Sequence, residues 1–287
     1  MGAREYKPVE VEPDGLPYND VGPWTEEKHR LVAYYAAQFS GAMKDKFQKR
    51  IYIELYAGAG YSRIRDTDRI IPGSPINALT LKEPFDKYIF CEENAKKRAA
   101  LEKRVWHHAR PNADVTFVPG DCDAHVAEIV AAIPRHSKAN KVLTLCFVDP
   151  NDIGIKFTTL RTLGATRMMD FIVLLALYMD ALRAEQHYVR DPTKINELLG
   201  TDVWQARWQE AKRKGTDFPH FLAEEFIASM AGMKYIPPPF YSMRKIFYYE
   251  KNYPLYAVGL FSRHPLAYSL WDDALKYTDD QLDLPGL

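Results

Sequence analysis

Residues 50–64, RIYIELYAGAGYSRI, combine an apolar run with two closely spaced glycines. Ile51 and Ile53 lie among other apolar residues, as in a strand that is covered on both faces. Gly58 and Gly60 follow where the strand must end, and a glycine turn at the carboxyl end of a parallel strand lets a ligand approach the backbone. A helix that begins just beyond the turn would aim its free N–H groups at that ligand. The turn-rich segment DTDRIIPGSPINALTL predicts a loop that leads into a short helix from about Ser74. A plain strand-to-helix turn explains the same pattern equally well.

Acidic side chains stand at the ends of the second and third predicted strands. KYIFCEEN closes with Glu92 and Glu93, and VTFVPGDC contains Asp121. One carboxylate offers two acceptors to a pair of ribose hydroxyls, which suits one of the two glutamates, and alternation along the strand favours Glu92. Both glutamates could instead be solvated residues at the start of a helix, and Asp121 could cap the helix that follows it.

The fourth predicted strand, within VLTLCFVDPND, ends in a group of polar side chains. Asp149 precedes Pro150, which cannot donate in a central ladder, and Asn151 and Asp152 follow. Their oxygens could accept hydrogen bonds from an amine and orient its lone pair, and Asp152 could also act as a general base. A strand-ending turn is the alternative for Asp149. Lys28, on the first predicted helix, could either reach a ligand or extend along the helix surface.

These residues need a sheet that brings several strand ends together. After an irregular arm at 1–22 and one helix, strands and helices alternate from 51 to 178, which predicts a parallel sheet covered by helices on both faces. Residues 180–235 favour helices, with Trp204 and Trp208 in the core of that region. SMRKIFYYEKNYPLYAVGLFSRH then contains two aromatic, β-branched runs around a short turn, which predicts an antiparallel hairpin.

Composition limits the classes of protein that are open. The 287 residues are 47% hydrophobic and carry 38 basic and 38 acidic side chains, so no global charge attracts nucleic acid. Cys91, Cys122 and Cys146 form no C-x-x-C pair, so we expect neither a metal site nor a disulfide framework, and a reducing cytoplasm suits the chain. No stretch approaches the roughly 20 apolar residues of a membrane span, and the polar N-terminus lacks a signal-peptide core. We therefore expect a cytoplasmic protein without a membrane partner.

The order of these motifs resembles the class I S-adenosylmethionine-dependent methyltransferase fold. The resemblance implies an α/β, Rossmann-like protein with a mostly parallel seven-stranded sheet, a terminal antiparallel hairpin and a helical insertion. Its parts would be an N-terminal arm and helix at 1–49, a cofactor-binding core at 50–178, the helical insertion at 179–240, and a hairpin and helix at 241–287 that complete the core. The implied cofactor is S-adenosylmethionine.

In that family each strand end has a defined role. The glycine turn passes under the methionine part of the cofactor, the acid after strand two binds the ribose, an aspartate after strand three reaches the adenine amine, and the strand-four motif faces the reactive methyl. The resemblance implies cofactor contacts from Glu54, Tyr56, Ala57, Gly58, Gly60, Glu92, Asp121 and Cys122, and a reactive face of Asp149, Asn151 and Asp152.

A closer resemblance covers nearly the whole chain. The segments WTEEKHRLVAYYAAQF, YIELYAGAG, GSPINAL, FVDPNDIG and LFSRHPLAYSLWDDAL are similar to those of the three-Cys-motif partner family, TcmP. The resemblance implies a partner, a three-Cys-motif protein encoded nearby, whose cysteines give the family its name. DPNDIG departs from the family, whose members more often have an aromatic residue and then glycine soon after D-P. An amine of RNA, DNA, a peptide or a small molecule stays open as the methyl acceptor.

Two other classes of protein share these features. A binding protein could keep the fold, work beside the three-Cys-motif protein and lack transfer activity, and the altered strand-four motif is consistent with this. A nucleotide-dependent oxidoreductase is disfavoured, because Arg63 stands where G-x-G-x-x-G spacing requires the third glycine.

Overall fold

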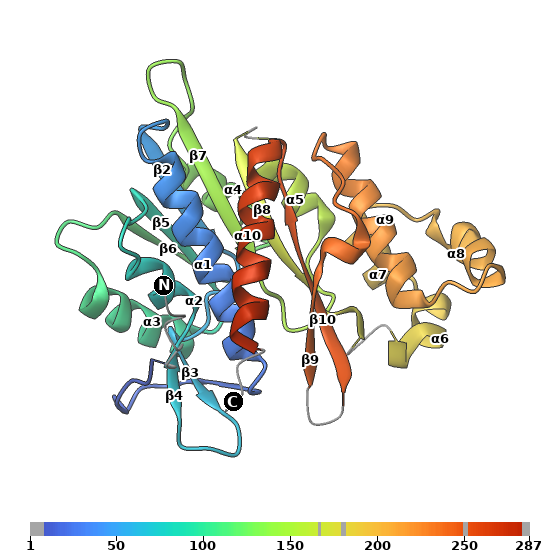
Figure 1. Ribbon diagram of the computed structural model, residues 1–287, viewed down its shortest axis with the longest axis horizontal. Helices are drawn as coiled ribbons and strands as arrows, with labels where there is room; N and C mark the ends of the chain where they lie inside the picture. Colours follow the sequence, from blue (N-terminus) through green and yellow to red (C-terminus); the bar gives the residue numbers. More distant parts are fainter. Residues whose placement is uncertain (1–8, 166–167, 179–181, 249–251, 283–287) are drawn as a thin grey trace.

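The computed structural model describes residues 9–165, 168–178, 182–248 and 252–282. The start of the predicted arm, the expected boundary at 178/179 and the last residues of the chain therefore lie outside the described parts. A seven-stranded sheet forms the centre of the molecule (Figure 1), in the order β6-β5-β2-β7-β8-β10-β9. Its strands are β2 (Lys49–Glu54), β5 (Lys87–Glu92), β6 (Val115–Pro119), β7 (Val142–Val148), β8 (Met169–Leu175), β9 (Arg244–Tyr248) and β10 (Tyr253–Phe261).

The direction of the strands confirms the expected α/β class. Strands β2, β5, β6, β7 and β8 pair in parallel, and β10 pairs antiparallel with both β8 and β9. The sheet is thus mixed, and only β10 runs against the other strands. If the seven strands of this sheet are numbered 1 to 7 along the chain, their order across the sheet is 3-2-1-4-5-7-6, and strand 7 (β10) is antiparallel. From β2 the chain first adds strands on one side, and from β7 onwards it adds them on the other side. At such a switch point a crevice opens beyond the carboxyl ends of the strands.

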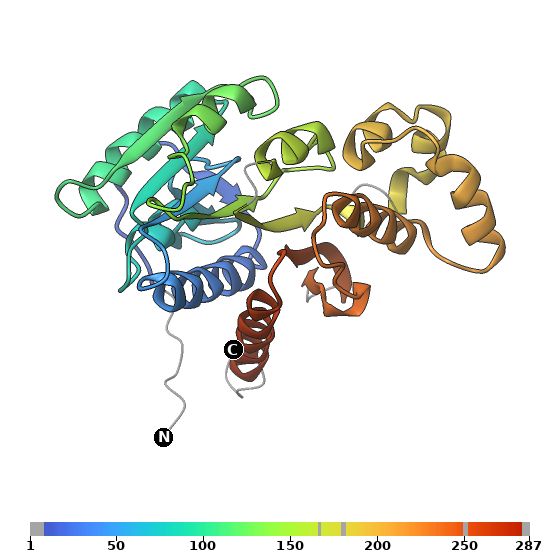
Figure 2. The same cartoon turned by 90° about the horizontal axis from the view of Figure 1, so that it is seen from above.

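Two apolar layers hold the helices against this sheet. Along β2 the side chains alternate, so that Ile51 and Ile53 belong to one core cluster and Tyr52 to the other. The first cluster is covered by α4 (Val126–Ala132), α5 (Phe157–Gly164), α7 (Thr193–Leu199) and α9 (Phe218–Gly232). The second is covered by α1 (Thr25–Met43), α2 (Ser74–Leu79), α3 (Ala95–His108) and α10 (Pro265–Leu282). Figure 2 shows α1 and α10 together on one side of the sheet.

The predicted helical region lies at one end of the molecule (Figure 1), with α6 (Leu182–Arg190) and α8 (Trp204–Arg213) beside α7 and α9. Trp204 and Trp208 are buried, at 0% and 2% exposed. The Trp208 ring lies 4.9 Å from the ring of Phe218 and 5.3 Å from that of Phe221. The prediction that both tryptophans form the core of this region is confirmed.

A second, three-stranded sheet corrects two expectations. Strand β1 (Asn19–Val21), within the arm expected to be irregular, pairs in parallel with β3 (Tyr61–Ile64), and β3 pairs with β4 (Ile70–Pro72). The glycine turn therefore leads into β3, and the turn-rich loop expected before Ser74 contains β4. The reason is burial: three of the four side chains of β3 are buried, so this segment is stabilised as a strand between two partners. The short helix expected from about Ser74 begins there, as α2.

Candidate functional site

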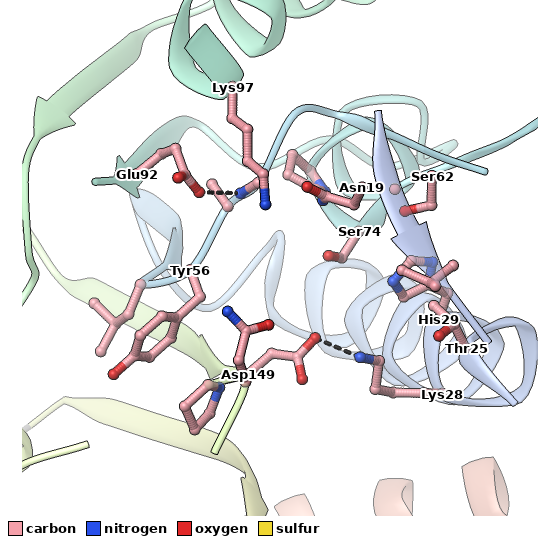
Figure 3. A pocket seen from close by; sticks show the side chains of 18 of the residues that line it. Asn19, Thr25, Lys28, His29, Tyr56, Ser62, Ser74, Glu92, Lys97 and Asp149 are labelled. Carbon is pink, nitrogen blue, oxygen red and sulfur yellow. Dashed lines mark hydrogen bonds and ion pairs between the residues drawn. The ribbon is translucent and has the colours of Figure 1, made fainter. Parts of the chain in front are cut away.

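A cavity of about 350 Å³ lies at the carboxyl ends of β2, β5 and β7 and beside the segment that follows β6. Figure 3 shows how side chains from these strand ends face one another across it. The cavity lining includes these predicted site residues: Tyr56, Ala57, Gly58, Glu92, Asp121, Cys122, Asp149 and Asn151; Glu93 lines it as well. Four strand ends that are far apart in the sequence thus meet around one space.

The glycine turn forms one wall of this cavity. Gly58 has a φ of +66°, a conformation that favours glycine. A Cβ atom added there would lie 2.1 Å from Nδ2 of Asn19 in β1, so a side chain is excluded by both conformation and space. The Gly58 N–H donates a 2.7 Å hydrogen bond to Oε2 of Glu92, which joins the ends of β2 and β5 (Figure 3).

The two glutamates after β5 are placed differently. Glu92 accepts hydrogen bonds on both oxygens, from Gly58 N and, at 2.8 Å, from Asn94 N. Glu93 is exposed and also lines the cavity. Alternation predicted that only one of them would face a ligand, but β5 ends at Glu92, so strict alternation stops there.

The loop after β6 supplies Asp121 and Cys122. Oδ1 of Asp121 accepts a 3.0 Å hydrogen bond from Asp123 N, which makes a local turn before α4. Cys122 is buried, and this burial raises the pKa of its thiol. Its side chain hydrogen-bonds with that of Tyr56, whose own pKa is raised by burial. Both groups are therefore neutral walls of the cavity at neutral pH.

An ion pair occupies the end of β7. Nζ of Lys28, from α1, lies 2.5 Å from Oδ2 of Asp149, and the two side chains are only 11% and 16% exposed. Figure 3 shows this pair on the side of the cavity opposite Glu92. The sequence left Lys28 open between a ligand role and a surface role, and the structure places it in the cavity.

Three predicted site residues, Glu54, Gly60 and Asp152, do not line the cavity. Glu54 is 1% exposed and accepts hydrogen bonds from the hydroxyls of Ser74 and Tyr52; burial and then the nearby Asp149 charge raise its pKa. Ser74 separates it from the cavity, which Ser74 itself lines. Gly60 instead holds the turn, since its carbonyl accepts a 2.7 Å hydrogen bond from Gly73 N.

Asp152 is directed away from the cavity. Its Oδ2 lies 2.7 Å from Nζ of Lys194, in α7. The two side chains are about half exposed, so this is a surface pair between the loop after β7 and the helical region, of a type that contributes little to stability.

The N-terminal segment contributes residues that the sequence did not single out. Asn19, His29 and Tyr256 of β10 line the cavity, and Asn19 Oδ1 and His29 Nδ1 are buried without a hydrogen-bond partner among the described residues. Burial, followed by the Lys28 charge, lowers the pKa of His29 to about 3, while a hydrogen bond with the Pro72 carbonyl acts in the opposite direction. His29 is thus a neutral acceptor. The sequence contains little indication that Asn19 belongs to this site, because only the pairing of β1 with β3 brings it to the cavity.

Arg104 fixes the N-terminal segment to the glycine turn. Its guanidinium is bound to both oxygens of Asp14 at 2.7 Å and donates to the Pro17 and Ala59 carbonyls at 2.7 and 2.6 Å. Arg104 is 2% exposed, and its hydrogen bonds lower the pKa of Asp14. A buried arginine on α3 thereby sets the position of the wall that contains Asn19.

Comparisons with known proteins give similarity of structure only. No family model matches the chain, and no curated protein matches its sequence. Among solved structures, a Legionella pneumophila protein of the DUF519 family model has a TM-score of 0.47 at 10% identity, over 88% of this chain and 92% of that one. M. jannaschii TYW2 in complex with S-adenosylmethionine has a TM-score of 0.41 at 10% identity, over 92% of this chain and 90% of that one. Pyrococcus horikoshii Trm1, also in complex with S-adenosylmethionine, has a TM-score of 0.43 at 11% identity, over 96% of this chain and 64% of that one.

The strand order defines an α/β protein with a mixed, mostly parallel seven-stranded sheet. Within the described residues, the histidines, cysteines and acids form no group that could hold a metal ion, and the three cysteines are free and buried. No helix in the described part of the chain is long and apolar enough to cross a membrane.

Proposed function

We propose that this chain is an S-adenosylmethionine-dependent methyltransferase. One observation carries the proposal: the glycine turn, Glu92, Asp121 and Asp149 stand at four successive strand ends and border one cavity. A doubly wound sheet places its ligand at such a point, and the ordered set of a backbone cradle and carboxylates suits a nucleoside joined to an amino acid.

The residues around the cavity are suited to each part of this cofactor. The glycine turn at Gly58 packs directly against Asn19 of the cavity wall. Asn19 and His29 present buried acceptors that lack partners among the described residues, and such acceptors suit an ammonium group. Glu92 keeps free lone pairs that would accept hydrogen bonds from ribose hydroxyls, and the carboxylate of Asp121 would accept one from the adenine amine. When bound, the cofactor supplies an electrophilic methyl group.

Asp149 and Asn151 are the proposed groups for the methyl acceptor. Both line the cavity, and their oxygens would accept hydrogen bonds from an amine and direct its lone pair towards the methyl. Positioning of this kind supplies much of the rate of a transfer reaction. Asp152, which pairs with Lys194, is less suited to the base role expected from the sequence.

An inactive binding protein is the second candidate. The ion pair between Lys28 and Asp149 favours it, because the carboxylate that would orient an acceptor already has a partner. The resemblance to the TcmP family adds a three-Cys-motif protein as the proposed partner in either case, and RNA, DNA, a peptide or a small molecule as the class of acceptor.

Calorimetric titration with S-adenosylmethionine tests the proposal. Gly58→Val should reduce the affinity at least tenfold, because its Cβ would displace Asn19 from the cavity wall. Gly41→Val is the matched control, since an added Cβ meets no atom within 4 Å there. Equal affinity of wild type and Gly58→Val would exclude the glycine turn from the cofactor site, and absence of binding to the wild-type chain would refute the proposed function.

A further inference from the structure

Charged side chains lie on two opposite sides of the cavity. On one side, Lys28 and Asp149 form a close pair of opposite charges with little exposure to solvent. On the other side, Lys97 of α3 lies beside Glu92 (Figure 3). His29 is neutral at pH 7, because its pKa is lowered to about 3, so it adds no charge next to the pair.

We propose that Lys28 cancels the charge of Asp149 at the transfer end of the cavity and thereby sets how strongly the site prefers the cationic cofactor to its neutral product. This inference rests on the proposed function. S-adenosylmethionine carries a sulfonium charge that S-adenosylhomocysteine lacks, and the two molecules otherwise differ by one methyl group. Any charge near the sulfonium therefore acts on the ratio of the two affinities.

The physical basis is the weak screening at this position. A charge in a partly buried site acts at an effective dielectric constant of about 20 rather than 80. An uncompensated Asp149 would attract the sulfonium and leave the thioether product almost unaffected. Lys28, at 2.5 Å from the carboxylate, offsets this attraction, so the wild-type site retains its product nearly as well as its cofactor. We expect the two dissociation constants of the wild-type chain to agree within about threefold.

Titration of four proteins with both ligands tests this role without a methyl acceptor. Lys28→Met should raise the preference for S-adenosylmethionine over S-adenosylhomocysteine at least fivefold. Asp149→Asn should lower it by a similar factor, because it leaves the lysine charge uncompensated. The double variant should return to the wild-type ratio, as expected for two residues that act as a pair.

A matched control separates this effect from general damage to the cavity. Lys97→Met removes a lysine that lines the same cavity far from the ion pair, so it should change both affinities by one common factor. Lys28→Arg keeps the charge and should keep the wild-type ratio. If Lys28→Met does not fold, Asp149→Asn still carries the test in the opposite direction.

The outcomes are distinct. Binding of both ligands with one unchanged ratio in Lys28→Met and Asp149→Asn would overturn this inference and leave the proposed function intact. A ratio that shifts equally in Lys97→Met would also overturn it, since the effect would then not belong to the pair. Failure of the wild-type chain to bind either ligand would overturn the proposed function and this inference with it.

Discussion

Glu92 is the residue that joins two strand ends, and its geometry gives a prediction for the ribose contact. Its carboxylate is held by the N–H groups of Gly58 and Asn94, whereas Glu93 is exposed. Glu92→Gln should weaken S-adenosylmethionine binding about tenfold, the equivalent of one hydrogen bond to a charged group. Glu93→Gln should change the affinity less than twofold. Calorimetry on both variants measures this, and equal losses would speak against Glu92 as the ribose ligand.

Asp149 is the residue whose loss should affect transfer more than binding. Its proposed interaction with the acceptor is made mainly on the way to the transition state. One lost charge-assisted hydrogen bond corresponds to about 1.5–3 kcal/mol, or roughly ten- to a hundredfold in rate. Asp149→Ala should therefore transfer methyl more slowly by that factor at saturating cofactor.

The measurement needs an acceptor, so cellular RNA, DNA and proteins, including the proposed three-Cys-motif partner, are screened first with methyl-labelled cofactor. Saturating cofactor removes any effect of the variant on affinity. Transfer at the wild-type rate by Asp149→Ala would rule out the proposed orienting role, and a larger loss would point to a further role in proton removal.

At the scale of elements, α3 and the N-terminal segment are connected through Arg104. Its removal takes away the guanidinium that donates to the carbonyls of Pro17 and Ala59 and to both oxygens of Asp14. Because Arg104 is buried, Arg104→Met should lower the free energy of unfolding by roughly 3 kcal/mol. Urea denaturation measures this loss. Lys103→Met, at the exposed neighbouring position, should stay within about 0.5 kcal/mol of wild type; equal stability of the two variants would show that Arg104 does not fix the segment.

At the scale of the whole molecule, the stability should depend on pH through His29. Burial lowers its pKa in the folded chain from 6.5 to about 3. Between these values the unfolded chain binds a proton that the folded chain does not, so stability falls as the pH falls below 6.5. The slope reaches about 1.4 kcal/mol for each pH unit.

The variant His29→Gln isolates this contribution, since glutamine does not titrate and can still donate to the Pro72 carbonyl. The free energy of unfolding of wild type relative to this variant should fall by about 2 kcal/mol between pH 6.5 and pH 5. Denaturation at several pH values measures the difference. A difference that stays constant over this range would contradict a buried, neutral His29.

The sequence by itself determined the large sheet and the ends of its strands. Apolar runs such as VLTLCFV are typical of strands that are buried on both faces. Helical segments separate these runs, and this alternation predicts that the strands are parallel. The glycine at position 58 and the acids at 92, 121 and 149 follow these strands directly. Their meeting around one cavity was therefore implied by local pattern and by the rule that parallel strands share a carboxyl edge.

Tertiary structure alone decided the wall that faces these strand ends. Strand β1 pairs with β3 across more than forty positions of sequence, and nothing local in residues 19–21 specifies that partner. Lys28 and Asp149 are 121 positions apart, and a lysine on a helix has the same local preference whether its amine meets solvent or a carboxylate. Such pairings depend on where packed layers place distant segments, so they were decided by the folded chain and not by any short pattern within it.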